Sequence, residues 1–177
     1  ELAFPFTAAE VVALGRTPFA DEHQTRHWQQ QAMALTECWH LRKRRYPGLS
    51  GGEPQRVQLA RVLVQIWQAL HQDGPPCLLL LDECTSALDP AHQHSIMNAV
   101  SHFANAGVGV IAVMHDLALA ASWADRILLL KQGRSLYNGA VSGLTSADLL
   151  ASCYDLEPDL ARRYAHSNRL WQPMSLT

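Results

Sequence analysis

The sequence contains no long hydrophobic run and no marked excess of one charge. Its apolar runs, such as residues 78–81 and 108–114, are far shorter than the ~20 residues that span a bilayer as a helix, so no membrane-spanning helix is predicted. The chain has 14 Lys and Arg residues against 16 Asp and Glu residues, which argues against a general nucleic-acid-binding surface. The one dense basic run, residues 42–45, is interpreted as a solvated helix end, with a contact surface as the alternative.

Cysteine pairs of the C-x-x-C type are also absent. Because Cys38, Cys77, Cys84 and Cys153 show no metal-binding spacing, the sequence predicts neither a metal site nor a disulfide framework, and it fits a reducing compartment. No signal-peptide pattern is visible. The chain begins with Glu1 rather than Met, so we expect that further residues precede it in the gene.

The patterns that are present predict a helical first part, followed by strands that alternate with helices. Helices are expected at residues 7–14, 25–39, 51–67, 91–104, 117–124 and 145–153, and buried strands at residues 78–81 and 108–114. Residues 127–131 and 135–138 flank a Gln-Gly-Arg turn, which predicts a hairpin. A polar tail is expected after Cys153. This alternation indicates an α/β fold.

Two adjacent carboxylates end the first predicted strand. Asp82 and Glu83 follow its apolar run, which places them at the carboxyl edge of a parallel sheet, where open α/β folds bind ligands. The first acid can hold Mg²⁺ through water, and the second can orient or deprotonate an attacking water. The alternative is an ordinary solvated strand end.

A second candidate site lies at the start of a predicted helix. Ser50, Gly51 and Gly52 precede it, and the free N–H groups and dipole of a helix N-terminus attract anions. Pro54 is expected in the first helical turn, where a missing N–H costs little. The alternative is an ordinary serine-capped helix.

His115 is a third candidate, because it comes just after the second predicted strand. A histidine in this place can contact a phosphate or polarise a water. A purely structural histidine is the alternative.

Together these residues resemble the ATP-binding cassette (ABC) ATPase family. Residues 49–53 resemble its signature motif, residues 78–83 its Walker B strand, residues 86–89 its D-loop, and His115 its switch histidine. The motifs occur in the family's order, with about thirty residues from signature to Walker B and again from Walker B to the histidine. The resemblance implies a partial P-loop NTPase fold in one domain. Residues 1–70 would form a helical signature subdomain, and residues 71–177 a parallel-sheet core with a hairpin and tail but without the P-loop strand.

A closer resemblance is to the ATPases of haemin importers. Residues 3–7, 11–16, 56–63 and 86–94 carry it. It implies the ATP-hydrolysing motor subunit of an importer, with haemin as the cargo. The alternatives are an importer ATPase for ferric siderophores or vitamin B12, and a truncated remnant without catalysis. A chromosome-maintenance or DNA-repair ATPase is disfavoured because no sustained heptads appear.

The resemblance assigns a role to each candidate residue. Glu83 would be the general base, His115 would contact the γ-phosphate, and Asp82 would support Mg²⁺ through water. The residues expected to bind ATP are Ser50, Gly51, Gly52, Glu53 and Asp89. The signature residues would reach ATP held by the opposite subunit, and Asp89 would link the two sites.

The resemblance also implies partners and a location. We expect a homodimer on the cytoplasmic face of the inner membrane, bound peripherally to permease subunits through residues 4–19, with no nucleic acid and no direct contact with cargo. The sequence departs from the family pattern in four places. The P-loop motif Gly-x-x-x-x-Gly-Lys-Ser/Thr and the Q-loop glutamine do not occur, Cys84 replaces a common Pro, and Pro54 replaces a common Gln. The 177 residues alone are therefore expected to be inactive.

Overall fold

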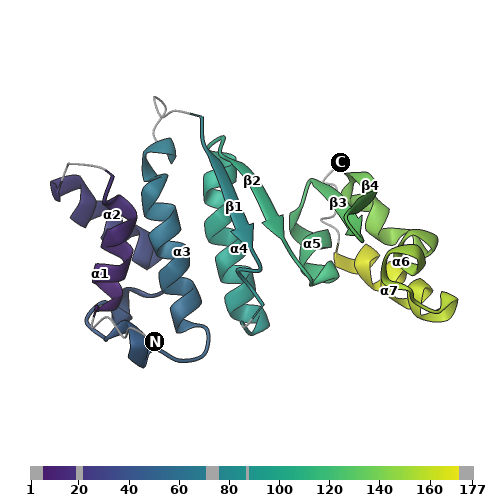
Figure 1. Ribbon diagram of the computed structural model, residues 1–177, viewed down its shortest axis with the longest axis horizontal. Coiled ribbons are helices and arrows are strands. Elements are labelled where there is room, and N and C mark those ends of the chain that lie inside the picture. Colours follow the sequence, from purple (N-terminus) through teal and green to yellow (C-terminus); the bar gives the residue numbers. More distant parts are fainter. Residues whose placement is uncertain (1–5, 19–21, 71–75, 87, 172–177) are drawn as a thin grey trace. The chain divides into compact units, whose positions relative to one another are not determined.

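The computed structural model describes residues 6–18, 22–70, 76–86 and 88–171. Residues 3–5, Phe19 and Ala87, which belong to segments singled out above, lie outside these residues. The chain forms two compact units, Glu1–Val113 and Met114–Thr177 (Figure 1).

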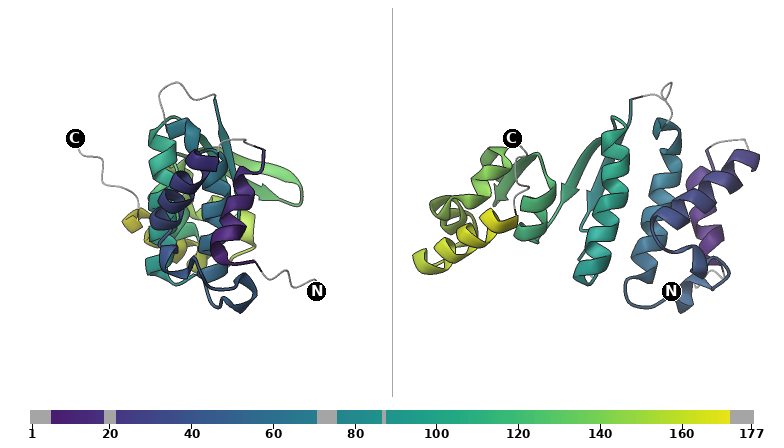
Figure 2. Two further views of the ribbon diagram at one scale, coloured as in Figure 1. Left: turned by 90° about the vertical axis from the view of Figure 1, so that its left-hand side faces the viewer. Right: turned by 180° about the vertical axis from the view of Figure 1, so that it is seen from behind.

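Three helices make up the first part of unit 1: α1 (Ala8–Ala13), α2 (Glu22–Leu35) and α3 (Glu53–Gln65). Helix α1 begins at a capping box, in which the Thr7 hydroxyl oxygen accepts from the Glu10 N–H and the Glu10 carboxylate accepts from the Thr7 N–H. Short 3-10 turns connect the helices, at Leu14–Arg16, Trp39–Leu41 and Tyr46–Gly48. The three helices lie side by side in both views of Figure 2, and α3 contacts both of the others. Their shared core is made of Val11, Val12, Ala32, Met33, Val57, Ala60, Leu63 and Val64.

A parallel strand pair with one helix completes unit 1. Strands β1 (Leu78–Asp82) and β2 (Gly109–Val113) pair in parallel, and α4 (Pro90–Asn105) connects them and runs alongside them (Figures 1 and 2). Asp89 caps α4 by accepting from the His92 N–H, and Pro90 occupies the first turn. The Phe103 ring of α4 packs edge-on against Trp67, with 5.4 Å between ring centroids.

The two strands are confirmed, but the prediction that they are buried on both faces is wrong. Leu79 and Leu81 are buried, whereas Leu78 and Leu80 on the opposite face of β1 are 58% and 65% exposed. The two faces differ because successive side chains of a strand point in opposite directions and α4 covers only one of them.

Unit 2 is a hairpin with three helices. Helix α5 (Leu117–Trp123) precedes the antiparallel strands β3 (Arg126–Lys131) and β4 (Arg134–Ala140), which confirm the predicted hairpin. A 3-10 turn (Val141–Thr145) leads to α6 (Ala147–Tyr154) and α7 (Pro158–Trp171). The core consists of Ala121, Leu129, Leu144, Leu150, Cys153 and Ala165. These elements, with those of unit 1, confirm the α/β class.

Helix α7 is not predicted by the sequence pattern, which indicates a polar tail in its place. The helix is polar at most positions, but Ala161, Ala165 and Asn168 lie on one buried stripe at helical spacing. Predicted helix ends were also displaced: α2 starts and ends earlier than expected, and α3 is shorter at both ends. Within the described part of the chain, no helix is both long and apolar enough to cross a membrane.

Among the described residues Phe103 has the largest fully buried side chain, and its truncation tests the packing of unit 1. We expect Phe103→Ala to lower the free energy of unfolding by ~3–5 kcal/mol, because a buried ring is lost and a cavity is left. Asn98→Ala, an exposed change on the same helix, should stay within ~0.5 kcal/mol of the wild type. Urea denaturation measures both, and equal effects of the two changes would contradict this account of the core.

Candidate functional site: the turn before α3 and the end of β1

The candidate anion site lies in the turn formed by residues 48–53, here called the signature turn. Gly52 is the N-cap of α3, so the alternative of a serine-capped helix is wrong. Gly51 has a φ of +57°, a left-handed conformation that glycine adopts without strain. Pro54 lies in the first helical turn, as predicted. Ser50 and Gly51 are exposed, so the turn presents its hydroxyl and backbone at the start of a helix, where the dipole favours anions.

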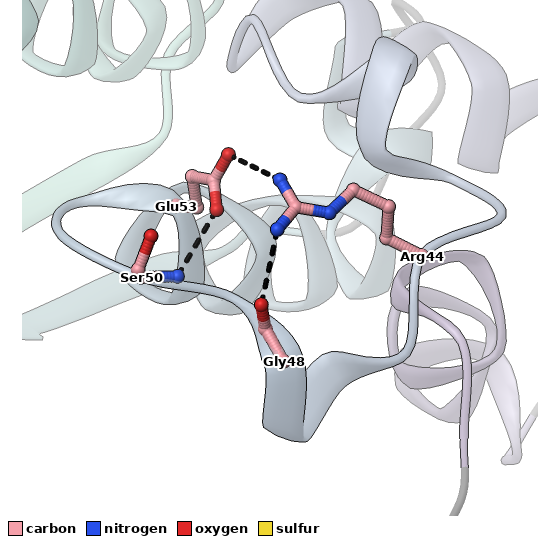
Figure 3. Close-up of polar contacts among 4 residues, drawn as sticks. All are labelled: Arg44, Gly48, Ser50 and Glu53. Carbon is pink, nitrogen blue, oxygen red and sulfur yellow. Dashed lines mark hydrogen bonds and ion pairs between the residues drawn. The ribbon is translucent and has the colours of Figure 1, made fainter.

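Two charged side chains brace the signature turn (Figure 3). The Arg44 guanidinium donates to Oε1 of Glu53 at 2.8 Å and to the carbonyl of Gly48 at 3.0 Å. The other carboxylate oxygen of Glu53 accepts from the Ser50 N–H at 3.0 Å. This N–H, assisted by the nearby Arg44 charge, holds the pKa of Glu53 below its ordinary value of 4.5. Glu53 is therefore a charged carboxylate that links the start of α3 back to the Ser50 N–H of the same turn.

Gly52 also connects the signature turn to the loop after β1. A Cβ atom at position 52 would lie 2.0 Å from Cδ2 of Leu88, which is buried. Only glycine fits this approach without movement of Leu88. The next residue, Asp89, accepts from both the backbone N–H and the ring Nδ1 of His92, and these hydrogen bonds lower its pKa. The signature turn and the D-loop segment therefore meet within one unit.

The paired carboxylates lie where β1 ends. Asp82 is the last residue of the strand and pairs with Val113 of β2, and the Glu83 N–H donates to the Val113 carbonyl at 3.2 Å. Glu83 has a φ of +48°, a strained value for a residue with a side chain, and such strain clusters at functional sites. Its carbonyl accepts from the backbone N–H and the hydroxyl of Ser86, which fixes this sharp turn. Both acidic residues are exposed at the sheet edge.

His115 belongs to unit 2 and lies in the segment that leads into α5. Asp116, next to it, caps this helix by accepting from the Leu119 N–H at 2.9 Å. His115 borders a hollow of about 320 Å³, which is lined by the segment before α5 and by α6 and α7. The side chains of Tyr154, Tyr164 and Asn168 form part of its wall. The histidine is thus exposed on a polar and aromatic surface.

The donor set at the end of β1 is compatible with Mg²⁺. Among the described residues no three His, Cys, Asp or Glu side chains gather into a metal-binding group. Magnesium does not need such a group, because it usually takes one or two carboxylates and completes its shell with water and substrate phosphates. Asp82, an exposed carboxylate at a strand end, fits that pattern.

The structure brings together several of the predicted residues within unit 1. Ser50 and Glu53 share a hydrogen bond, and Gly52 meets the residue next to Asp89. Sequence reasoning missed the roles of Arg44 and Leu88. The sequence interprets Arg44 as part of a solvated basic run, and its separation of nine residues from Glu53 matches neither helical nor strand periodicity.

Comparisons with known proteins agree with these motifs. The chain is 45% identical over 159 residues to the hemin import ATP-binding protein HmuV of Gloeobacter violaceus, a match covering 88% of this chain and 57% of the relative. It is 51% identical over 135 residues to the HmuV of Pseudomonas entomophila, covering 76% and 51% of the two chains. A solved metal-chelate type ABC transporter in an inward-facing conformation aligns with a TM-score of 0.71 at 25% identity, covering 88% of this chain and 61% of that one. No protein-family model matches.

The fold, the site and these relatives agree, and the chain belongs to the ABC ATPase family. Within that family it is similar to the hemin import ATP-binding proteins. The chain spans about half the length of the curated relatives that it matches.

The charge of Glu53 gives a testable pH dependence. Its folded-state pKa is lowered, so its contribution to stability is complete above the ordinary value of 4.5 and is lost as pH falls through the lower folded value. We expect the stability difference between the wild type and Glu53→Gln to be constant near neutral pH and to shrink below pH 4.5. Urea denaturation at a series of pH values measures this, and a difference that grows on acidification would contradict it.

Proposed function

We propose that this chain is part of the ATP-hydrolysing motor subunit of an ABC importer, with haemin as the cargo. The single observation that carries the proposal is the signature turn. It presents an exposed serine and two glycines at a helix start, and Gly52 packs against the D-loop segment. The relatives named above, whose names specify hemin import and ATP binding, support the cargo and the nucleotide.

The proposed chemistry divides between two sets of residues. Ser50, Gly51 and Gly52, with Asp89, bind ATP across a dimer interface, where the helix dipole and the serine hydroxyl favour the γ-phosphate. Glu53 belongs to this set because its carboxylate accepts from the Ser50 N–H and so shapes the turn. The second set consists of Asp82, Glu83 and His115. In it, Asp82 supports Mg²⁺ through water, Glu83 takes the proton of the attacking water, and His115 contacts the γ-phosphate. A bound Mg²⁺ would neutralise charge on the transferred phosphate.

The composition of the signature turn supports the proposed dimer. It offers anion-binding groups, yet its one carboxylate, Glu53, is engaged by Arg44 and by the Ser50 N–H and is not available as a base. A general base and a metal ligand must therefore come from elsewhere, and in this proposal they are Glu83 and Asp82 of a second copy.

The remaining proposals concern organisation and partners. Residues 1–70 form the signature subdomain and residues 71–177 the core. Residues 4–19 contact a transmembrane permease on the cytoplasmic face of the inner membrane, and the chain touches neither nucleic acid nor cargo. The likeness to a metal-chelate type transporter supports a second candidate cargo, an iron chelate such as a siderophore or the cobalt chelate vitamin B12.

Ser50→Arg tests the proposed role of the signature turn. In the product of the complete gene, the bulky side chain should obstruct the approach of the phosphate and lower ATP turnover by about 10²-fold or more, the scale of losing a phosphate-stabilising group. Ser135→Arg, the same change at an exposed serine of β4, is the control and should leave turnover near the wild-type rate. Phosphate release measures both, with circular dichroism to show that each variant is folded. Full turnover in Ser50→Arg would refute the assignment.

A further inference from the structure

Arg44 is placed to control the signature turn from outside it. Its guanidinium binds one group before the turn's exposed tip, the Gly48 carbonyl, and one group after it, the Glu53 carboxylate (Figure 3). Glu53 in turn accepts from the Ser50 N–H. The three hydrogen bonds, at 2.8, 3.0 and 3.0 Å, thus hold both ends of the segment from Gly48 to Glu53.

The backbone of Arg44 is itself anchored. Its N–H donates to the Leu41 carbonyl at 2.8 Å, and its carbonyl accepts from the Ala8 N–H at 2.9 Å, in the first turn of α1. The neighbouring Tyr46 N–H donates to the Phe6 carbonyl at 2.8 Å. The guanidinium therefore projects from a fixed piece of chain, which reduces the entropy lost in holding the turn.

The charge of Glu53 explains why such a residue is needed. A carboxylate in the first turn of a helix is favourable for the helix dipole, but it repels any phosphate that binds at the same N-terminus. Arg44 places a positive charge 2.8 Å from this carboxylate. It also directs the other carboxylate oxygen to the Ser50 N–H, so the acid is held in one position and its charge is offset.

We infer that Arg44 is a positioning residue for ATP: it neutralises and fixes Glu53 so that the signature turn can accept a polyphosphate. Arg44 acts through Glu53 and does not touch the nucleotide in this account. The inference rests on the proposed function of the signature turn. It predicts that loss of Arg44 weakens ATP binding more than it slows the chemical step, because the released carboxylate repels the phosphate.

The test compares Arg44→Met with Arg45→Met in the product of the complete gene. Arg45 is the adjacent exposed arginine, and its replacement removes the same charge from the same basic run. We expect Arg44→Met to raise the KM for ATP about two- to fivefold, the range that a partly exposed ion pair supports, with kcat within twofold of the wild type. Arg45→Met should leave KM unchanged. Equal increases in both variants would overturn the inference, because they would show a general effect of net charge.

A second comparison shows whether Arg44 acts through Glu53. Gln at position 53 keeps an oxygen that can accept from the Ser50 N–H but carries no charge, so in the Glu53→Gln background the Arg44→Met change should have almost no effect on KM. Arg44→Lys, which keeps the charge, should recover part of the wild-type KM. The same rise in KM with and without the Glu53 charge would contradict the inference. These outcomes are separate from the proposed function, which full turnover in Ser50→Arg would refute whatever the Arg44 variants show.

Discussion

The close approach of Gly52 to Leu88 is the constraint on which the candidate site depends. A Cβ atom at position 52 would lie 2.0 Å from Cδ2 of Leu88, so any other residue here would force the Leu88 side chain to move where the start of α3 meets the loop after β1. This contact gives the signature turn and the D-loop segment a fixed relation within unit 1. Arg44 and Glu53 then fix the shape of the turn itself. The signature turn is thus constrained twice. Inside unit 1 it packs against Leu88 at Gly52, and at the surface the Arg44–Glu53 ion pair holds it.

The site is built from the ends of elements rather than from their middles. Asp82 makes the last pairing of β1 with β2 and Glu83 follows it, whereas the glycines precede the first turn of α3. Such positions combine backbone groups outside the helix or strand ladder with partial charges that attract ions. Glu83 adds a left-handed backbone, which its hydrogen bonds to Val113 and Ser86 maintain. The arrangement therefore places the signature turn and the two acidic residues on separate loops of one chain.

Much of the fold could be predicted because its signals are local. The capping box at Thr7, the Asp89-Pro90 start of α4 and the Gln-Gly-Arg hairpin turn each specify structure within a few residues. The helix α7 was missed because its buried stripe is made of alanines and one asparagine, which carry little hydrophobic signal. The exposed face of β1 was also not predictable, because an apolar run does not reveal which neighbours cover it.

The residues of the candidate site could be predicted from their motifs, but the contacts between them could not. Ser50, the glycines and the acids are specified by order and spacing, whereas the contact of Gly52 with Leu88 and the bridge from Arg44 to Glu53 join residues without periodic spacing. Only folding brings such residues together.

A complementation assay tests the central claim most directly, namely that the signature turn of one copy completes the site formed by Asp82 and Glu83 of another. Subunits carrying Ser50→Arg are mixed with subunits carrying Glu83→Gln, each inactive alone because one lacks phosphate binding and the other lacks the general base. In a mixed dimer both defects fall in one site and the other site is intact, so ATP turnover should reappear. A mixture that forms dimers but stays as inactive as its components would contradict the account, since each site would then lie within a single chain.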